Sequence, residues 1–299
     1  MKILLLGRNG QVGWELQRAL APLGELVAPS RHEGGDLSKV DELTELAYAS
    51  GAHVIVNAAA YTAVDRAEDP SQQAACMDIN AGAPAALAMV ARECGALLVH
   101  YSSDYVFDGR GDEPHDEDDS PGAESVYGES KAAGDFAIQH SGCVHLILRT
   151  SWVYSARGGN FAKTMLRLAQ ERDELRVVAD QFGAPCGAEL IADTTAHMIR
   201  HTLVNPGLAG LYNLAPTGHT SWHGYACHVI EGARRRGLAV RVAADRVLPV
   251  STDEYPTAAV RPRNSRLHVD KLQHTFGLRL PPWTQGVDRL LDELIPPQP

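Results

Sequence analysis

The sequence predicts an α/β fold, a doubly wound parallel sheet with a smaller C-terminal domain. Three observations support this class. The first 150 residues repeatedly alternate short apolar runs with helical patterns, which is typical of strands joined by crossover helices. The first apolar run, residues 2–6, leads directly into a glycine-rich turn and then into a helical pattern. Beyond residue 150 the alternation becomes irregular, which indicates a change of architecture.

The expected elements can be read in order along the chain. Short apolar runs bounded by glycine or polar residues predict buried parallel strands, listed here by number: 2–6, 25–29, 53–56, 96–100, 144–148 and 210–214, with a short strand ending at 35–37 and a strand-like run at 240–250. Helical spacing predicts helices over 14–21, 39–49, 71–94 (with Pro84 allowing a kink), 127–140, 160–172, 189–203, 221–236 and 287–295.

These elements suggest a domain division. Residues 1–150 form the dinucleotide-binding domain, and part of 187–220 rejoins its sheet. Residues 151–186 and 221–299 form a smaller substrate-binding domain over the carboxyl ends of the strands.

Composition excludes several classes of function. The chain has 299 residues, 44% of them hydrophobic, which suffices for a sizeable core. Its net charge of −10 and the lack of basic blocks, apart from residues 234–236 at a predicted helix end, argue against nucleic acid. Five cysteines without C-x-x-C spacing are expected to be reduced. No run looks like a signal peptide or membrane span, so we expect a cytoplasmic protein.

The glycine turn is the first functional signal. Gly7, Gly10 and Gly13 follow a predicted strand and open a helix, the context of a Rossmann dinucleotide site. Glycines permit a tight turn, and the helix start offers N–H groups to a pyrophosphate. Gln11 and Val12 belong to the same turn. An ordinary strand-to-helix turn is the alternative, and the spacing of three glycines favours the cofactor site.

The end of the second strand should select the cofactor. NAD-selective sites place an acidic residue there to hold the ribose, but this chain reads Ser30-Arg31-His32. Arg31 could hold the 2′-phosphate of NADPH, or could be a solvated surface arginine. Asp36, beside Leu37, could accept from the adenine amino group or cap the next helix.

A second cofactor segment follows the third major strand. Small side chains there would let a ribose lie against the backbone. The segment comprises Ala58, Ala59, Ala60, Tyr61 and Thr62. Asn80, inside the long helical region, could be exposed or could reach the active-site helix through water.

The catalytic signal is a tyrosine and a lysine four residues apart on a predicted helix. Tyr127 and Lys131 would share one helix face, where an ammonium would lower the pKa of the phenol. Such a phenol can protonate a developing alkoxide. Tyr-x-x-x-Lys alone also fits an exposed helical pair. Ser103, at the carboxyl end of the preceding strand, adds a hydroxyl to the same edge and favours a carbonyl-reducing site.

Together these motifs resemble the extended short-chain dehydrogenase/reductase family, and within it the branch that reduces dTDP-4-dehydro-L-rhamnose to dTDP-L-rhamnose. The resemblance runs nearly end to end, through GRNGQVGWELQRAL, VIVNAAAYTAVDRAE, HYSSDYVFDG, VYGESK, LRTSWVYS, NFAKTMLRLA, DQFGAPCGAEL and YPTAAVRPRNSRL. It implies NADPH (with NADH as a further option), a dTDP-sugar substrate and a role in making lipopolysaccharide O-antigen.

The resemblance also implies residue roles. Tyr127 would donate the proton, Lys131 would tune it and hold the nicotinamide ribose, and Ser103 would bind the keto oxygen. Asp104, Tyr105 and Trp152 would contact the deoxysugar, and Tyr101 would contact the cofactor. Residues 261–266 could grip a pyrophosphate or could be a basic loop.

Two further expectations come from the resemblance. Relatives bind magnesium at a homodimer contact, and Glu15, Glu189 and Glu293 match that set, although ordinary helix-surface glutamates are the alternative. The family also includes catalytically silent regulatory subunits and sugar-nucleotide epimerases. An intact Ser103, Tyr127 and Lys131 favours the reductase.

Overall fold

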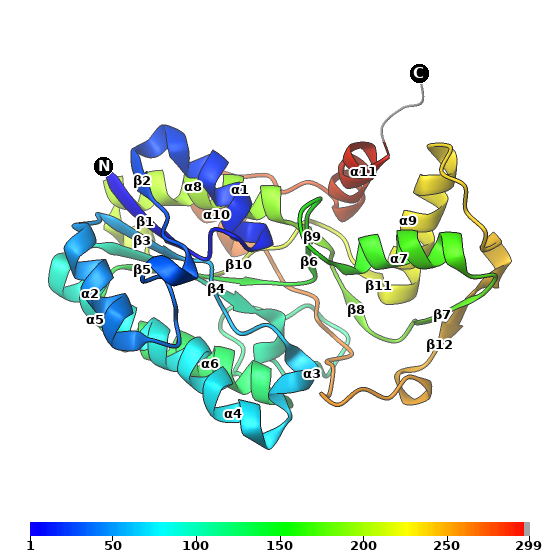
Figure 1. Cartoon of the computed structure of the whole chain (residues 1–299), viewed down its shortest axis with the longest axis horizontal. Coiled ribbons are helices and arrows are strands. Elements are labelled where there is room, and N and C mark those ends of the chain that lie inside the picture. Colours follow the sequence, from blue (N-terminus) through cyan, green and yellow to red (C-terminus); the bar gives the residue numbers. More distant parts are fainter. Residues whose placement is uncertain (296–299) are drawn as a thin grey trace.

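The computed structural model describes residues 1–295, and its centre is a sheet of six parallel strands in the order β10-β5-β4-β3-β1-β2 (Figure 1). The strands are β1 (Lys2–Leu6), β2 (Glu25–Val27), β3 (Val54–Asn57), β4 (Leu97–Ser103), β5 (His145–Thr150) and β10 (Gly210–Asn213). The predicted α/β class and the parallel sheet are therefore confirmed.

Strand register brings the functional loops to one edge of the sheet. Leu6 at the end of β1 is paired with Asn57 at the end of β3, and Ser103 at the end of β4 is paired with Thr150. All these strands run in parallel, so the segments that follow them emerge side by side.

Two helical layers cover the sheet, as Figure 1 shows. One apolar core joins β-strand side chains to α1 (Gln11–Leu20), α8 (Ala188–Val204) and α10 (Asp270–Phe276). The other joins them to α2 (Val40–Ser50), α5 (Ala83–Cys94) and α6 (Val126–Gln139). Strand β10 comes from late in the chain and pairs with β5, and α10 packs beside it on α8.

A third apolar core lies beside the sheet, at the right of Figure 1. It holds α7 (Phe161–Glu171), α9 (Trp222–Arg235) and α11 (Trp283–Leu294) around the buried rings of Tyr154 and Tyr225. The flanking short strand pairs are β7 (Leu175–Val178) with β12 (Val247–Val250), β6 (Val153–Tyr154) with β9 (Cys186–Gly187), and β8 (Phe182–Gly183) with β11 (Thr220–Ser221).

The predicted helix over 71–94 is interrupted. Helix α4 (Pro70–Met77) passes into a π-helical turn, Asp78–Gly82, before α5 begins. Pro84 has no N–H to donate to the carbonyl four residues earlier, that of Asn80 in this turn, so the irregularity lies where Pro84 was expected to allow a kink. By length and hydropathy alone, Pro70–Cys94 could cross a membrane, contrary to the expectation that no run is long enough. Nearly half of its most apolar window is buried inside the protein, as in a core helix.

Two local predictions are wrong. Residues 35–37 form no strand, because Gly35 donates its N–H back to the Ser30 carbonyl in a turn. The strand-like run over 240–250 is a strand only from Val247, after a 3₁₀ turn at Ala244–Arg246. The short α3 (Val64–Ala67) and α10 were not predicted.

Candidate active site

A cavity of about 1050 Å³ opens at the carboxyl edge of the sheet. The residues predicted for the cofactor, the chemistry and the sugar line it, except Gly13 of the glycine turn and residues 262–266 of the possible pyrophosphate loop, and Glu15, Glu189 and Glu293 do not. Because these residues come from six separate segments between residues 7 and 152, their meeting in one cavity is a property of the fold.

The glycine turn forms a cradle that side chains would fill. Gly7 has φ +84°, and a Cβ there would lie 2.6 Å from the Ala58 backbone. A Cβ on Gly13 would lie 2.1 Å from the Gly7 carbonyl oxygen, so α1 approaches β1 closely. Helix α1 begins after Gly10 without a side-chain cap, which leaves its first N–H groups for an anion. The cradle fits the pyrophosphate of a dinucleotide.

Asn80 ties the second cofactor segment to the catalytic helix. It is buried in the π-helical turn, accepts from Tyr61 N at 2.9 Å and donates to the Tyr61 carbonyl at 3.0 Å. Its amide also donates to Ser130 Oγ on α6 at 3.0 Å. The direct contact to α6 replaces the water bridge considered from the sequence. The segment that would hold a ribose is thus fixed relative to Tyr127 and Lys131.

Ser103, Tyr105 and Tyr127 form the centre of the cavity. Tyr105 and Tyr127 meet edge to face with ring centroids 5.8 Å apart. Ser103 accepts from Tyr105 N at 3.1 Å and donates to Asp104 Oδ1 at 2.8 Å. A keto oxygen between Ser103 and Tyr127 would face the Tyr127 hydroxyl, and the single Ser103 O–H would become a second donor by turning from Asp104 to that oxygen.

The expected pKa effect on Tyr127 is wrong for the protein without cofactor. Burial raises the pKa of the phenol above its ordinary value, and the Ser103 hydroxyl only partly opposes this. Lys131 does not lower it. The Lys131 Nζ instead donates to the Tyr101 carbonyl at 2.6 Å and contacts His100 Nε2 at 3.1 Å. A protonated phenol is the form that an acid catalyst needs.

Asp104 carries an unused acceptor. Its carboxylate is 2% exposed, and Oδ2 has no hydrogen-bond partner among residues 1–295. Burial raises the pKa of Asp104 to about 6, with the hydroxyls of Ser265 and then Ser103 opposing this rise. A buried acceptor without a partner is costly, so the site is suited to a ligand hydroxyl.

The aromatic end of the cavity contains a strained residue. Trp152 has φ +44°, the only positive φ of a non-glycine residue within 1–295. Its ring stacks on Trp222 with centroids 3.6 Å apart and planes 14° apart. A Cβ on Gly183 would lie 2.7 Å from the Trp152 ring, so this wall is tightly packed. No sequence pattern indicated Trp222, which lies 70 residues further along the chain.

Comparison with known proteins assigns the family. The profile described as "RmlD substrate binding domain" matches residues 1–295. The chain belongs to this family. Its relatives include dTDP-4-dehydrorhamnose reductases from Escherichia coli K12 and Shigella flexneri, which are 52% and 53% identical to it over 297 residues, 98% of each chain.

Solved structures agree with this membership. A dTDP-4-dehydrorhamnose reductase from Bacillus anthracis, in complex with NADP, is 34% identical and covers 98% of this chain and 99% of its own, with a TM-score of 0.86. An orthologue from Clostridium acetobutylicum is 32% identical over similar shares, with a TM-score of 0.87. The family resemblance inferred from the motifs is therefore confirmed, and the chain belongs to a family of NADP-dependent oxidoreductases.

In this RmlD family member, the cofactor-selecting end of the cavity is held by ion pairs. Arg31 Nε donates to Asp36 Oδ2 at 2.9 Å. Partial burial raises the pKa of Asp36, but hydrogen bonds from Arg31 and Ser38 outweigh it and lower the pKa to about 2. A carboxylate is present after all: Glu33 accepts from Ser30 N at 2.7 Å and lies 3.5 Å from Arg8. The sequence interpretation missed it because Glu33 turns back in a capping box.

The structure adds contacts that the sequence motifs did not indicate. Asn160 donates to Gln11 Oε1 at 3.0 Å, and the Arg157 guanidinium lies over the Trp14 ring. These contacts close the segment after β6 over the glycine turn. Arg261 contacts the Tyr105 hydroxyl at 3.4 Å and pairs with Asp65 at 2.6 Å.

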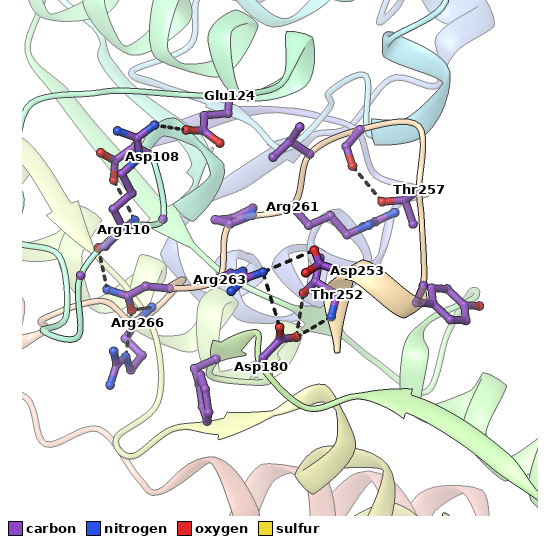
Figure 2. A pocket seen from close by; sticks show the side chains of 18 of the residues that line it. Asp108, Arg110, Glu124, Asp180, Thr252, Asp253, Thr257, Arg261, Arg263 and Arg266 are labelled. Atoms are coloured by element: carbon purple, nitrogen blue, oxygen red, sulfur yellow. Dashed lines mark hydrogen bonds and ion pairs between the residues drawn. The ribbon is translucent and has the colours of Figure 1, made fainter. Parts of the chain in front are cut away.

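Arg261 also lines a second cavity, of about 700 Å³, shown in Figure 2. Four arginines line it: Arg110, Arg261, Arg263 and Arg266. Arg263 lies 3.8 Å from Asp180 and 3.5 Å from Asp253, and Arg110 pairs with Glu124 at 2.7 Å. The Phe182 ring lines the same cavity and is 38% exposed.

The predicted metal ligands do not fit a metal within one chain. Within residues 1–295 no group of three His, Cys, Asp or Glu side chains is arranged to hold an ion. Glu15 and Glu293 lie 3.3 Å from Arg18 and Arg289. Burial, and then the carboxylates of Glu293 and Glu15, raise the pKa of Glu189. The three glutamates are neighbours, but arginines neutralise two of them.

Proposed function

We propose that this protein reduces dTDP-4-dehydro-L-rhamnose to dTDP-L-rhamnose with NADPH, the last step of dTDP-rhamnose synthesis for O-antigen. The supporting observation is the single cavity that holds Gly7, Ser103, Tyr127 and Lys131. Relatives with half of their residues in common carry the corresponding name.

The residues of this chain would act as follows. When bound on the glycine cradle, NADPH supplies a hydride to C4 of the sugar. Ser103 and Tyr127 orient the keto oxygen, and the Tyr127 phenol gives its proton to that oxygen as C4 is reduced. Lys131 holds the ribose beside the nicotinamide, and Asp104 Oδ2 accepts from a sugar hydroxyl. The face of Trp152 accepts the methyl group of the deoxysugar.

The dTDP group would extend from the first cavity into the second. Arg261, labelled in Figure 2 among the residues of the second cavity, also lines the first and would bridge the two. A diphosphate carries the charge that Arg261 and its neighbours Arg263 and Arg266 complement. The Phe182 ring offers a face for the pyrimidine base.

Other finer assignments are part of the same proposal. Residues 1–150 hold the cofactor and the smaller C-terminal part holds the sugar nucleotide. We propose a cytoplasmic enzyme that acts on neither nucleic acid nor membranes and uses NADPH more readily than NADH. A homodimer, which the family resemblance implies, is part of the same proposal. The proposed chemistry is assigned to Ser103, Tyr127 and Lys131 and does not require magnesium.

The test is turnover of the purified protein with dTDP-4-dehydro-L-rhamnose and NADPH. We expect loss of NADPH absorbance in a 1:1 ratio to dTDP-L-rhamnose separated by chromatography. Unreduced sugar with normal NADPH binding would instead indicate the silent binding protein. Tightly bound NAD with inversion of a sugar centre, and no consumption of NADPH, would indicate an epimerase.

A further inference from the structure

Lys131 has a buried neighbour that the proposed reaction leaves unused. His100 lies in β4, is 1% exposed and places Nε2 3.1 Å from Lys131 Nζ. The other ring nitrogen, Nδ1, lies 3.2 Å from the side-chain amide of Asn57 at the end of β3. The imidazole thus connects the catalytic helix to the segment that would hold the cofactor ribose.

The amide of Asn57 determines which nitrogen of His100 carries the proton. Asn57 Oδ1 accepts from Ala59 N at 3.2 Å, so its NH₂ group faces the imidazole. Nδ1 must then accept, and a neutral imidazole has only one accepting nitrogen. The remaining proton is on Nε2 and points at Lys131. Burial and then the charge of Lys131 lower the pKa of His100 well below its ordinary value, so the ring is neutral.

We propose that His100 is a positioning residue for the reaction, which donates its Nε2–H to Lys131 Nζ and so favours the uncharged amine over the ammonium. An amine can accept this hydrogen bond and still donate to the Tyr101 carbonyl at 2.6 Å. An ammonium has no lone pair and can only meet the Nε2–H as a second donor. The role of Lys131 in the reaction rests on the proposed function, whereas the hydrogen bonds among Asn57, His100 and Lys131 do not.

The other charges around Lys131 act in known directions. Burial is the main cause that lowers the pKa of Lys131, to about 8, and the carboxylate of Asp135 and the thiol of Cys76 oppose it. Asp135 is neutralised by Arg149 of β5 at 3.1 Å. The other titratable groups that line the same cavity are Tyr127 on the same helix and Asp104 and Tyr105 from the turn Asp104–Val106. His100 differs from these groups because it is neutral and because Asn57 determines which of its two nitrogens carries the proton.

This arrangement would let Lys131 change charge near neutral pH. After each turnover the Lys131 ammonium can give a proton to the Tyr127 phenolate, which leaves the uncharged amine that His100 stabilises, and this amine then recovers a proton from solvent. The Lys131 ammonium loses the proton and the phenolate gains it, so the transfer is balanced.

Direct titration of Lys131 by NMR tests the inference without relying on activity. The chain has only five lysines (Lys2, Lys39, Lys131, Lys163 and Lys271), so ¹³Cε-lysine labelling gives a sparse spectrum. Lys131→Arg identifies the Lys131 signal. In His100→Gln, the side-chain amide can turn its carbonyl oxygen toward Lys131 and accept a hydrogen bond from the ammonium. The imidazole cannot do this in the parent protein, because Asn57 keeps its proton on Nε2. We expect the Lys131 midpoint to rise by about one pH unit, the effect of changing one hydrogen bond from opposing to favouring the charge.

Asn57→Ala provides an independent variant that keeps the imidazole. Without the Asn57 amide, Nδ1 can carry the proton and Nε2 can accept from the ammonium, so the midpoint should again rise. His145→Gln, the same exchange on neighbouring strand β5, should leave the midpoint unchanged. An unchanged or lower midpoint in either folded test variant, or an equal rise in the control, overturns the inference. A parent enzyme that lacks reductase activity overturns the proposed function instead, while the titration remains readable.

Discussion

The rings of Trp152 and Trp222 are stacked with their centroids 3.6 Å apart, although one residue follows β5 and the other begins α9. The pair joins the sheet to the helical core beside it. The positive φ of Trp152 determines where its ring lies, and the stacked ring of Trp222 supports it there. If this wall binds the deoxysugar, then loss of its supporting ring should affect the sugar and not the cofactor.

Trp222→Ala tests this wall. We expect KM for the sugar nucleotide to rise about tenfold, because one stacked aromatic pair contributes roughly 0.5–1.5 kcal/mol beyond its buried area. The Kd for NADPH, measured by fluorescence, should stay within twofold. Phe136→Ala, at a ring that is 61% exposed on α6, is the control for loss of an aromatic residue. A larger effect on NADPH than on sugar would assign Trp222 to the cofactor side.

Tyr127→Phe tests the proton donor. The substitution removes the hydroxyl and keeps the edge-to-face contact with Tyr105. Because general acid catalysis typically contributes ~10² to 10⁴ in rate, we expect kcat to fall within that range. NADPH binding should persist. If kcat stays within a few-fold of the parent value, another group donates the proton.

Asp104 should destabilise the fold above neutral pH. Its folded pKa, about 6, exceeds the ordinary value of 3.8, so its contribution to stability is present below pH 4 and is lost as pH rises through 6. Asp104→Asn removes that penalty, which amounts to about 3 kcal/mol because each pKa unit corresponds to about 1.4 kcal/mol. We expect Tm to rise at pH 8 but hardly at pH 4, while kcat/KM for the sugar falls. Equal Tm changes at both pH values would mean that ionisation is not the cause.

Arg31 should favour NADPH. We expect kcat/KM to be higher with NADPH than with NADH, and Arg31→Ala to narrow the gap, because Arg31 lines the cofactor cavity next to Ser30. Its pairing with Asp36 means that the variant also frees a carboxylate near the ribose. Arg18→Ala, on the far side of α1, controls for loss of a surface arginine. Equal use of both cofactors by the parent enzyme would contradict the assignment.

The buried pair of Asp135 and Arg149 should be important for stability. Both side chains are at most 3% exposed, and Asp135 Oδ1 has no partner within residues 1–295. Arg149→Met would leave Asp135 charged and buried, at a cost of about 3–5 kcal/mol by urea denaturation. The double variant Asp135→Leu with Arg149→Met should recover much of that loss. A single variant as stable as the parent would show that Asp135 is protonated in the native protein.

Much of the fold and the cavity lining could be predicted from local patterns. The run Lys2–Leu6 is β1 as expected, and the first two glycines of the turn, Ser103 and the Tyr127–Lys131 pair all line one cavity. These features could be predicted because each depends on neighbours within a few residues of the sequence. The direction of the Tyr127 pKa shift could not be predicted in this way, since it depends on how completely the fold buries the ring.

Other features depend on residues far apart in the chain. Trp222 reaches the cavity from α9, and no local pattern marks it. Arg261 was noted only as part of a basic loop, and its place in the cavity depends on the path of the chain after β12. Asn80 and Asn57 are ordinary polar residues in the sequence, and only tertiary contacts to Tyr61 and His100 give them a role. The wrongly predicted strand at 35–37 has a local cause. The Gly35 N–H is already bonded to the Ser30 carbonyl in a turn, so it is not available for pairing with another strand.

Strand β10 closes one edge of the sheet, yet it is made only after residue 209. A fragment that stopped near residue 150 would leave β5 with an open backbone edge and would strip α8 and α10 from one apolar face. We expect such a fragment to aggregate through this exposed edge and apolar face, and not to fold into an independent NADPH-binding domain. We therefore expect that the proposed cofactor-binding and sugar-binding parts cannot be exchanged as separate domains between relatives. Point substitutions along the second cavity are a more direct way to change the sugar preference.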